Sequence, residues 1–153
     1  MLNPYESFVS GQNPQEVIAA TPDRLAQLAT LPQRPPAPGK WDVREVLCHL
    51  ADTEIAFAFR LRQSVAEDHH TIQPFDQDKW AIPYAAYDVG GALEVFRALR
   101  RWNLKFIGAQ PAGMFERPVS HPERGQMTFQ TVVETMAGHD MNHIKQIECL
   151  CSR

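Results

Sequence analysis

Apolar residues recur at helical spacing in four segments of the chain, and connections rich in proline, glycine and polar residues separate these segments. The first predicted helix begins after Asn13 as N-cap, has Pro14 in its first position and ends near Thr30. Pro22 lies inside this pattern and predicts a kink or a later start. Residues 1–12 predict an irregular arm or a short turn.

Three more helices follow. The second begins after Asp42, has Glu45 in the capping-box position and runs to about Glu67. The third begins after Asp88 and extends to about residue 107. The fourth spans residues 128–151, with Thr128 as its cap, and its apolar stripe comprises Val132, Val133, Met136, Ile144, Ile147 and Leu150.

The two long connections differ in character. Residues 68–87 contain four aromatic residues, so we expect this loop to fold over the helices and bury its rings. Residues 108–125 contain prolines and glycines and predict a plain connection. Four amphipathic helices joined by polar segments predict an all-α four-helix bundle, and the length predicts a single domain over residues 1–153.

Charge and composition narrow the range of partners and locations. The net charge is −3, and no run of Lys or Arg is present, which argues against a nucleic-acid or anionic-membrane surface. No apolar run approaches the roughly 20 residues of a membrane span, and the first residues lack the pattern of a signal peptide. The three cysteines, an odd number, are most simply reduced thiols. We therefore expect a cytoplasmic protein.

Two histidines of the fourth helix indicate a metal site. Relative to Met136, His139 is rotated roughly 60° and His143 roughly 20° to the same side, so both rings face the core. They are four residues apart, which places both on one helix face, as in helical zinc sites. The alternative is a pair of core histidines that only make hydrogen bonds.

A third ligand has to come from another helix. His49 lies roughly 100° from Leu50, on the flank that faces a neighbouring helix, and is either a ligand or a structural histidine. Asp52 is close enough to orient His49, although a solvated carboxylate is the alternative. Cys48 points roughly 160° from Leu50, away from the apolar stripe, and is not expected to bind metal.

Three histidines lie in the connections. We expect His69 and His70 to be solvated. His121 either contributes to a nearby site or makes local hydrogen bonds in a turn.

Five blocks of sequence resemble the DinB-like superfamily, and in particular its branch called YfiT-like metal-dependent hydrolases. The blocks occur in the family's order and cover nearly the whole chain from about residue 10. They are Lys40–Asp52, Arg60–Arg62, Pro74–Trp80, His121–Glu123 and His139–Ile147.

The resemblance implies a four-helix bundle in which His49, His139 and His143 hold one divalent metal ion. Nickel and zinc are the ions it implies first, with iron and manganese as alternatives. It also implies a homodimer and a small-molecule substrate. Some members of the family are transferases or isomerases that use bacillithiol, mycothiol or glutathione.

Three functions follow as hypotheses. The first is a metal-dependent hydrolase that uses a metal-bound water, because a three-histidine site leaves positions open for substrate. The second is a thiol-dependent transferase or isomerase on the same metal site. The third is a non-enzymatic, metal-stabilised stress-response or binding module. Asp52 and Asp140 are candidates to orient the ligands, whereas no catalytic base is assigned.

Overall fold

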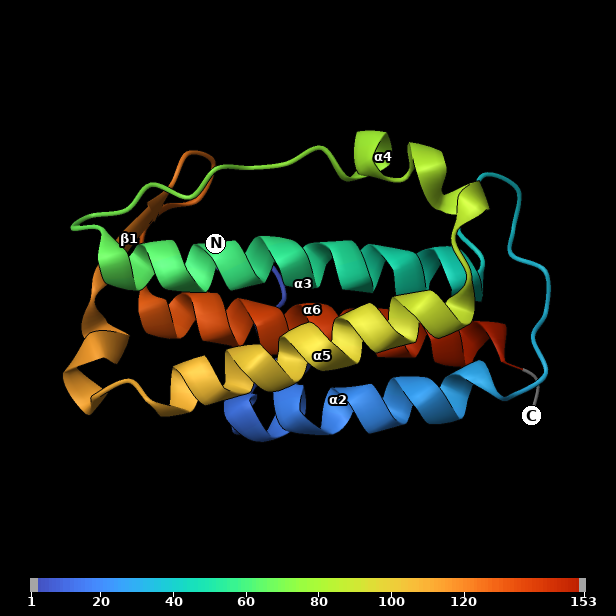
Figure 1. Cartoon of the computed structure of the whole chain (residues 1–153), viewed down its shortest axis with the longest axis horizontal. Coiled ribbons are helices and arrows are strands. Elements are labelled where there is room, and N and C mark those ends of the chain that lie inside the picture. Colours follow the sequence, from blue (N-terminus) through green and yellow to red (C-terminus); the bar gives the residue numbers. More distant parts are fainter. Residues whose placement is uncertain (1–2, 152–153) are drawn as a thin grey trace.

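The computed structural model describes residues 3–151 and consists mainly of four long helices packed side by side (Figure 1). They are α2 (Pro14–Ala29), α3 (Val43–Ala66), α5 (Val89–Gly108) and α6 (Phe129–Leu150). Helix α1 (Glu6–Val9) is a single turn in the N-terminal arm. The predicted all-α bundle is therefore confirmed. The single domain over residues 1–153 stays a prediction.

The predicted helix starts are confirmed by their caps. Asn13 accepts a hydrogen bond from the backbone of Gln15, and α2 continues past Pro22 to Ala29. Asp42 and Glu45 form a reciprocal capping box at the start of α3. Such bonds satisfy amide groups that lack a partner in the first turn, which is why a cap fixes where a helix begins.

The connectivity of the bundle is set by the long connection from α3 to α5. This segment runs back along the length of α3, so α3 and α5 point in the same direction (Figure 1). Helix α3 packs against both α5 and α6, and α2 packs against the same two helices. The predicted second and fourth helices, α3 and α6, are thus neighbours, as the metal hypothesis requires.

The aromatic loop is more ordered and less buried than expected. It contains the short helix α4 (Gln77–Trp80) and the 3-10 helix η1 (Ile82–Ala86). Tyr84 is buried, but Trp80 is 38% exposed and Tyr87 is 47% exposed. The expectation that the loop buries its rings is wrong for these two residues, which instead line surface grooves.

The connection before α6 contains a β-hairpin, which corrects the prediction of a plain connection. After the 3-10 helix η2 (Ala112–Glu116), strand β1 (Pro118–His121) pairs antiparallel with β2 (Gly125–Thr128). Gly125 has φ of 84°, which a residue with a side chain rarely adopts. The backbones of His70 and Ile72 bond to Ser120, so the hairpin is tied to the start of the aromatic loop.

One further expectation was wrong, and it concerns His70. Cys48 is buried in a cluster that includes Tyr84, and it is not among the potential metal ligands of the described residues, as predicted. His70 is also buried, and its Nδ1 lies 2.6 Å from a carboxylate oxygen of Glu67, whereas His69 is exposed as predicted. The cysteines carry no disulfide in the described part of the chain.

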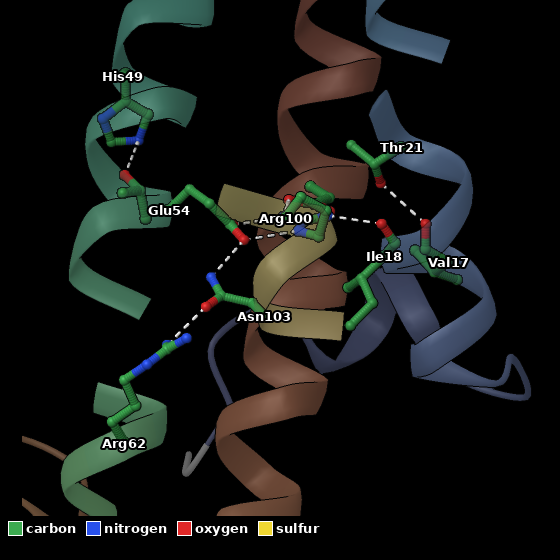
Figure 2. A network of polar contacts seen from close by, with 10 residues as sticks. Val17, Ile18, Thr21, His49, Glu54, Arg62, Arg100 and Asn103 are labelled. Carbon is green, nitrogen blue, oxygen red and sulfur yellow. Dashed lines mark hydrogen bonds and ion pairs between the residues drawn. The ribbon is translucent and has the colours of Figure 1, made fainter. Parts of the chain in front are cut away.

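A buried arginine joins the four helices. Arg100 of α5 donates to both oxygens of Glu54 on α3, to both oxygens of Asp140 on α6 and to the backbone oxygen of Ile18 on α2 (Figure 2). Asn103, one turn along α5, donates a further bond to Glu54. Arg100, Glu54 and Asp140 are each 1% exposed.

The cluster holds one positive and two negative groups. Burial opposes the charge on Arg100, but Asp140 and Glu54 outweigh it and hold the pKa of Arg100 above its usual value. Burial raises the pKa of Asp140, although Arg100 acts in the opposite direction. A buried ion network of this kind contributes specific packing, and loss of one member leaves an uncompensated charge.

None of the helices within residues 3–151 has the length and apolar character needed to span a bilayer.

Candidate metal centre

Three buried imidazoles converge between α3 and α6. His49 comes from the second turn of α3, and His139 and His143 come from one face of α6. Their ring centroids lie 4.4 to 5.1 Å apart, and one nitrogen from each lies within 4.8 Å of the others. The structure thus assembles the three residues that the sequence singled out, and their role as metal ligands stays a prediction.

The spacing of the nitrogens fits one metal ion. Two imidazole nitrogens bound at 2.0 to 2.1 Å in tetrahedral geometry lie about 3.3 Å apart. The Nε2 atoms of His49 and His139 are 3.1 Å apart. This distance also suits a hydrogen bond between the two rings in the metal-free protein. Nδ1 of His49 is buried with no partner among the described residues, whether Nε2 binds a metal or a neighbouring ring.

Burial keeps the three rings neutral, which metal binding requires. Desolvation, aided by His143, lowers the pKa of His49 to about 3. Desolvation and the neighbouring His143 and His49 hold the pKa of His139 well below its usual value. Desolvation also lowers the pKa of His143, with Gln146 opposing. At neutral pH the rings present lone pairs rather than charges.

Gln146 orients His143, a role that the sequence analysis did not assign. Nδ1 of His143 lies 2.8 Å from Oε1 of Gln146. Since the amide oxygen only accepts, Nδ1 carries the proton and Nε2 is left free for a metal. The three-residue spacing along α6 was the available signal, because it places the two side chains one turn apart.

The two carboxylates predicted to orient the ligands have other partners. Asp52 accepts a hydrogen bond from the hydroxyl of Tyr84 at 3.0 Å, and burial raises its pKa. Asp140 pairs with Arg100. Within residues 3–151 neither carboxylate bonds to a site imidazole, so the geometry does not support the role predicted for them.

Aromatic rings cover the cluster on two sides. The ring of Trp41 lies 4.9 Å from that of His49, and the ring of Tyr5 meets that of His139 edge-on at 5.5 Å. The approach of Tyr5 depends on Gly138. A Cβ atom at this position would lie 2.5 Å from Cβ of Tyr5 and 2.7 Å from its backbone oxygen, so only glycine leaves room for the N-terminal arm.

A cavity of about 180 Å³ opens beside His49 and His139. Its walls come from α3, α6, the aromatic loop, the tip of the β-hairpin and the N-terminal arm. The group of potential ligands contains the three histidines and no fourth His, Cys, Asp or Glu among the described residues. The cluster is therefore a candidate three-ligand site beside a cavity, an arrangement that catalytic zinc sites also have.

His121 lies in the wall of this cavity and is buried. Its Nδ1 accepts a hydrogen bond from the backbone amide of Glu123 at 3.2 Å. The local hydrogen bond and the proximity to the site, which the sequence presented as alternatives, thus both occur.

Comparison with known proteins agrees with this picture. The DinB superfamily matches residues 16–147. A protein of Oceanobacillus iheyensis named "Putative metal-dependent hydrolase" is 32% identical over 120 residues, which cover 75% of this chain and 67% of that protein. A Bacillus mycoides protein with the same kind of name is 29% identical over 117 residues, with the same coverage.

Among solved structures, the chain is similar to YfiT from Bacillus subtilis, described as "a probable metal-dependent hydrolase with an unusual four-helix bundle topology". The TM-score is 0.78 at 22% identity, over 89% of this chain and 84% of YfiT, so the likeness concerns the fold. The match over residues 16–147 covers most of the chain and includes all three histidines. The chain belongs to the DinB superfamily.

Proposed function

We propose that this protein is a metal-dependent hydrolase whose metal is held by His49, His139 and His143. The observation that carries the proposal is the open side of the centre, where two of the three neutral imidazoles, His49 and His139, line a polar cavity and no fourth protein ligand among the described residues closes the site. A structural metal site is normally closed by four protein ligands. The names of the relatives from Oceanobacillus and Bacillus support the same reaction class.

His49, His139 and His143 would hold a divalent ion, which when bound would supply Lewis acidity for hydrolysis. The chain supplies the rest of the site. Gln146 fixes the ring of His143 in the tautomer that a metal needs. Trp41 and Tyr5 cover the outer edges of the other two rings and exclude bulk water. The cavity beside His49 and His139 then determines which molecules reach the centre.

Zinc and nickel are the ions that we propose first. Three imidazoles without a thiolate or carboxylate form a donor set that suits both ions, and iron also binds imidazole well. Manganese prefers oxygen ligands, so this donor set favours it least.

The experiment begins with elemental analysis of untagged protein. Protein reconstituted with zinc or nickel is then screened against esters and amides, with and without a low-molecular-weight thiol. Metal-dependent turnover without thiol supports the hydrolase. Turnover that requires the thiol supports the transferase alternative. Stoichiometric metal without turnover in either screen supports a non-enzymatic module.

We also propose that the protein forms a homodimer through an apolar face on α3. Ile55 lines two adjoining grooves, one with Phe59 and Trp80 and the other with Tyr87 and Val95. These five side chains are 38% to 58% exposed. A continuous apolar surface of this kind is typical of protein interaction sites, which supports the proposal.

A further inference from the structure

Two arginines from different elements line the cavity beside the histidines. Arg60 lies two turns beyond Thr53 on α3, and Arg124 lies at the tip of the β-hairpin. The loop residues Pro74 and Phe75 line the same cavity. The space beside the metal centre is thus flanked by two cationic groups from separate elements.

Arg60 is held in place without a carboxylate partner. Its guanidinium carbon lies 5.7 Å from the ring of Phe57 and 5.4 Å from that of Phe75. One of its nitrogens donates to the backbone oxygen of Gln73 at 3.2 Å. Within residues 3–151 no Asp or Glu lies within 4.0 Å of this guanidinium. A half-buried arginine fixed by two aromatic rings retains donors for a further anionic partner.

The charges around Arg60 leave the cavity positive. Burial and the nearby Arg124 lower the pKa of Arg60 to about 10, so it remains charged at neutral pH. Arg124 likewise has no carboxylate within 4.0 Å in the described part of the chain. Glu123 is the one acidic residue that lines the cavity, and it is exposed. Two close guanidinium groups repel each other unless an anion lies between them.

His121 adds a neutral donor to the same wall. Because Nδ1 accepts the amide hydrogen of Glu123, the ring proton lies on Nε2. Burial, together with Arg124 and Arg60, lowers the pKa of His121, which favours the neutral ring. An anion in the cavity therefore finds two guanidinium groups and one ring N–H.

We propose that the cavity binds a small substrate carrying a carboxylate or phosphate group, which pairs with Arg60 and Arg124 while the bond to be cleaved lies at the histidines. The inference rests on the proposed hydrolase and specifies its substrate class. At about 180 Å³ the cavity is smaller than the 300 Å³ or more typical of drug-sized ligands, which limits the substrate to a compact molecule.

The first test measures binding without catalysis. Succinate, inorganic phosphate and the uncharged succinamide are titrated into zinc-loaded and metal-free protein and followed by NMR shifts of cavity residues. We expect succinate or phosphate to bind both forms, and succinamide at least ~10-fold more weakly. A preference between the two anions then identifies the carboxylate or the phosphate as the natural group.

Matched variants assign the binding to the arginines. Arg60→Gln and Arg124→Gln are each expected to weaken binding of the preferred anion by at least ~10-fold. Arg101→Gln, which removes the same charge from an exposed position outside the cavity, should leave it unchanged. Arg60→Lys retains the positive charge, and we expect it to bind the anion more tightly than Arg60→Gln does. This comparison separates loss of the charge from a change in the fold. Equal binding by all variants, or equal affinity for succinamide and succinate, would overturn the inference.

A second test separates this inference from the proposed function. Ester pairs that differ only in a terminal carboxylate or amide are offered to zinc-loaded protein. Faster hydrolysis of the anionic member, lost in Arg60→Gln, supports both proposals. If anions bind in an arginine-dependent way but no ester is hydrolysed, the anion site is supported and the hydrolase is rejected. Hydrolysis with no preference and no effect of either arginine retains the hydrolase and rejects the anion site.

Discussion

The Nε2 atoms of His49 and His139 lie 3.1 Å apart, although 90 residues separate them in the chain. Each belongs to a different long helix, and both rings are buried. Two imidazole nitrogens at this spacing match a pair of ligands around one ion.

Removal of His139 should abolish tight metal binding. His139→Ala leaves two ligands, which is too few for a stable protein site, so we expect metal content to fall from about one per chain to near zero. Elemental analysis of untagged protein measures this. His121→Ala is the matched control, because His121 lines the same cavity outside the ligand cluster and should leave metal content intact. A His139→Ala protein with a full complement of metal would contradict the assignment.

Metal affinity should depend little on pH between 8 and 6. Three ordinary imidazoles with pKa near 6.5 would lose roughly 60-fold in affinity over this range through proton competition. In this site burial lowers all three pKa values, so fewer protons compete and we expect a loss of less than about fivefold. Competition titrations of metal-free protein with a calibrated chelator provide the measurement. A steep decline below pH 7 would show that the rings titrate normally.

Gly138→Ala should displace the N-terminal arm from the metal centre. The added methyl group would lie 2.5 Å from Cβ of Tyr5, a distance that neither backbone can accommodate without moving. We expect faster amide hydrogen exchange in residues 3–9 of the arm. Alanine itself favours helix α6 by about 1 kcal/mol relative to glycine, so the faster exchange would not come from a weaker helix. Gly108→Ala, also in a helix but with open space around it, should leave exchange in the arm unchanged. Unchanged exchange in Gly138→Ala would mean that the arm does not pack there.

Arg100→Met should destabilise the bundle strongly. The substitution leaves the carboxylates of Glu54 and Asp140 buried without their cation, which costs about 3–5 kcal/mol in the free energy of unfolding. Urea denaturation of metal-free protein measures the change. Arg101→Met, one residue away and exposed, should change stability by no more than about 0.5 kcal/mol. Similar values for the two variants would show that the buried network contributes little.

Phe59→Asp should shift the proposed homodimer to monomer. Phe59 is 58% exposed, so a charge there is tolerated in the monomer but disfavoured inside an apolar interface. Sedimentation velocity over a concentration series measures the mass. Leu31→Asp introduces the same charge at another exposed apolar residue, which lies outside the two grooves, and should have no effect. A wild-type protein that is monomeric at all concentrations would reject the dimer.

Local signals in the sequence predicted the helices well. The capping box joins Asp42 and Glu45, which are only three residues apart, so it can be recognised in a short segment of sequence. The helical spacing of His139 and His143 likewise placed both rings on one buried face. The hairpin was missed because each of its strands has only four residues, too few for a clear alternating pattern. The hydrogen bonds that tie it to His70 and Ile72 come from a distant part of the chain.

Other features depend on contacts that no local pattern reveals. Arg100 appears in the sequence as an ordinary charged residue of an amphipathic helix, yet the packing of α2, α3 and α6 around it makes it the best-paired cation in the core. Arg60 and Arg124 also appear in the sequence as ordinary charged residues. They are 64 positions apart, and both line the same cavity because the tip of the hairpin lies near α3.

The sequence by itself determined the four helices, their starting points and the two histidines of the last helix that share one face, because helical period and capping act over a few residues. The resemblance to the DinB-like superfamily added His49 as the expected third ligand, since its position on the helix left a structural role open. Tertiary structure decided which groups surround those histidines. It directed Asp140 to Arg100, placed Trp41 and Tyr5 against His49 and His139, and brought Arg60 and Arg124 to the wall of one cavity. These partners are chosen by helix packing and loop closure, which bring together residues that are remote in the chain.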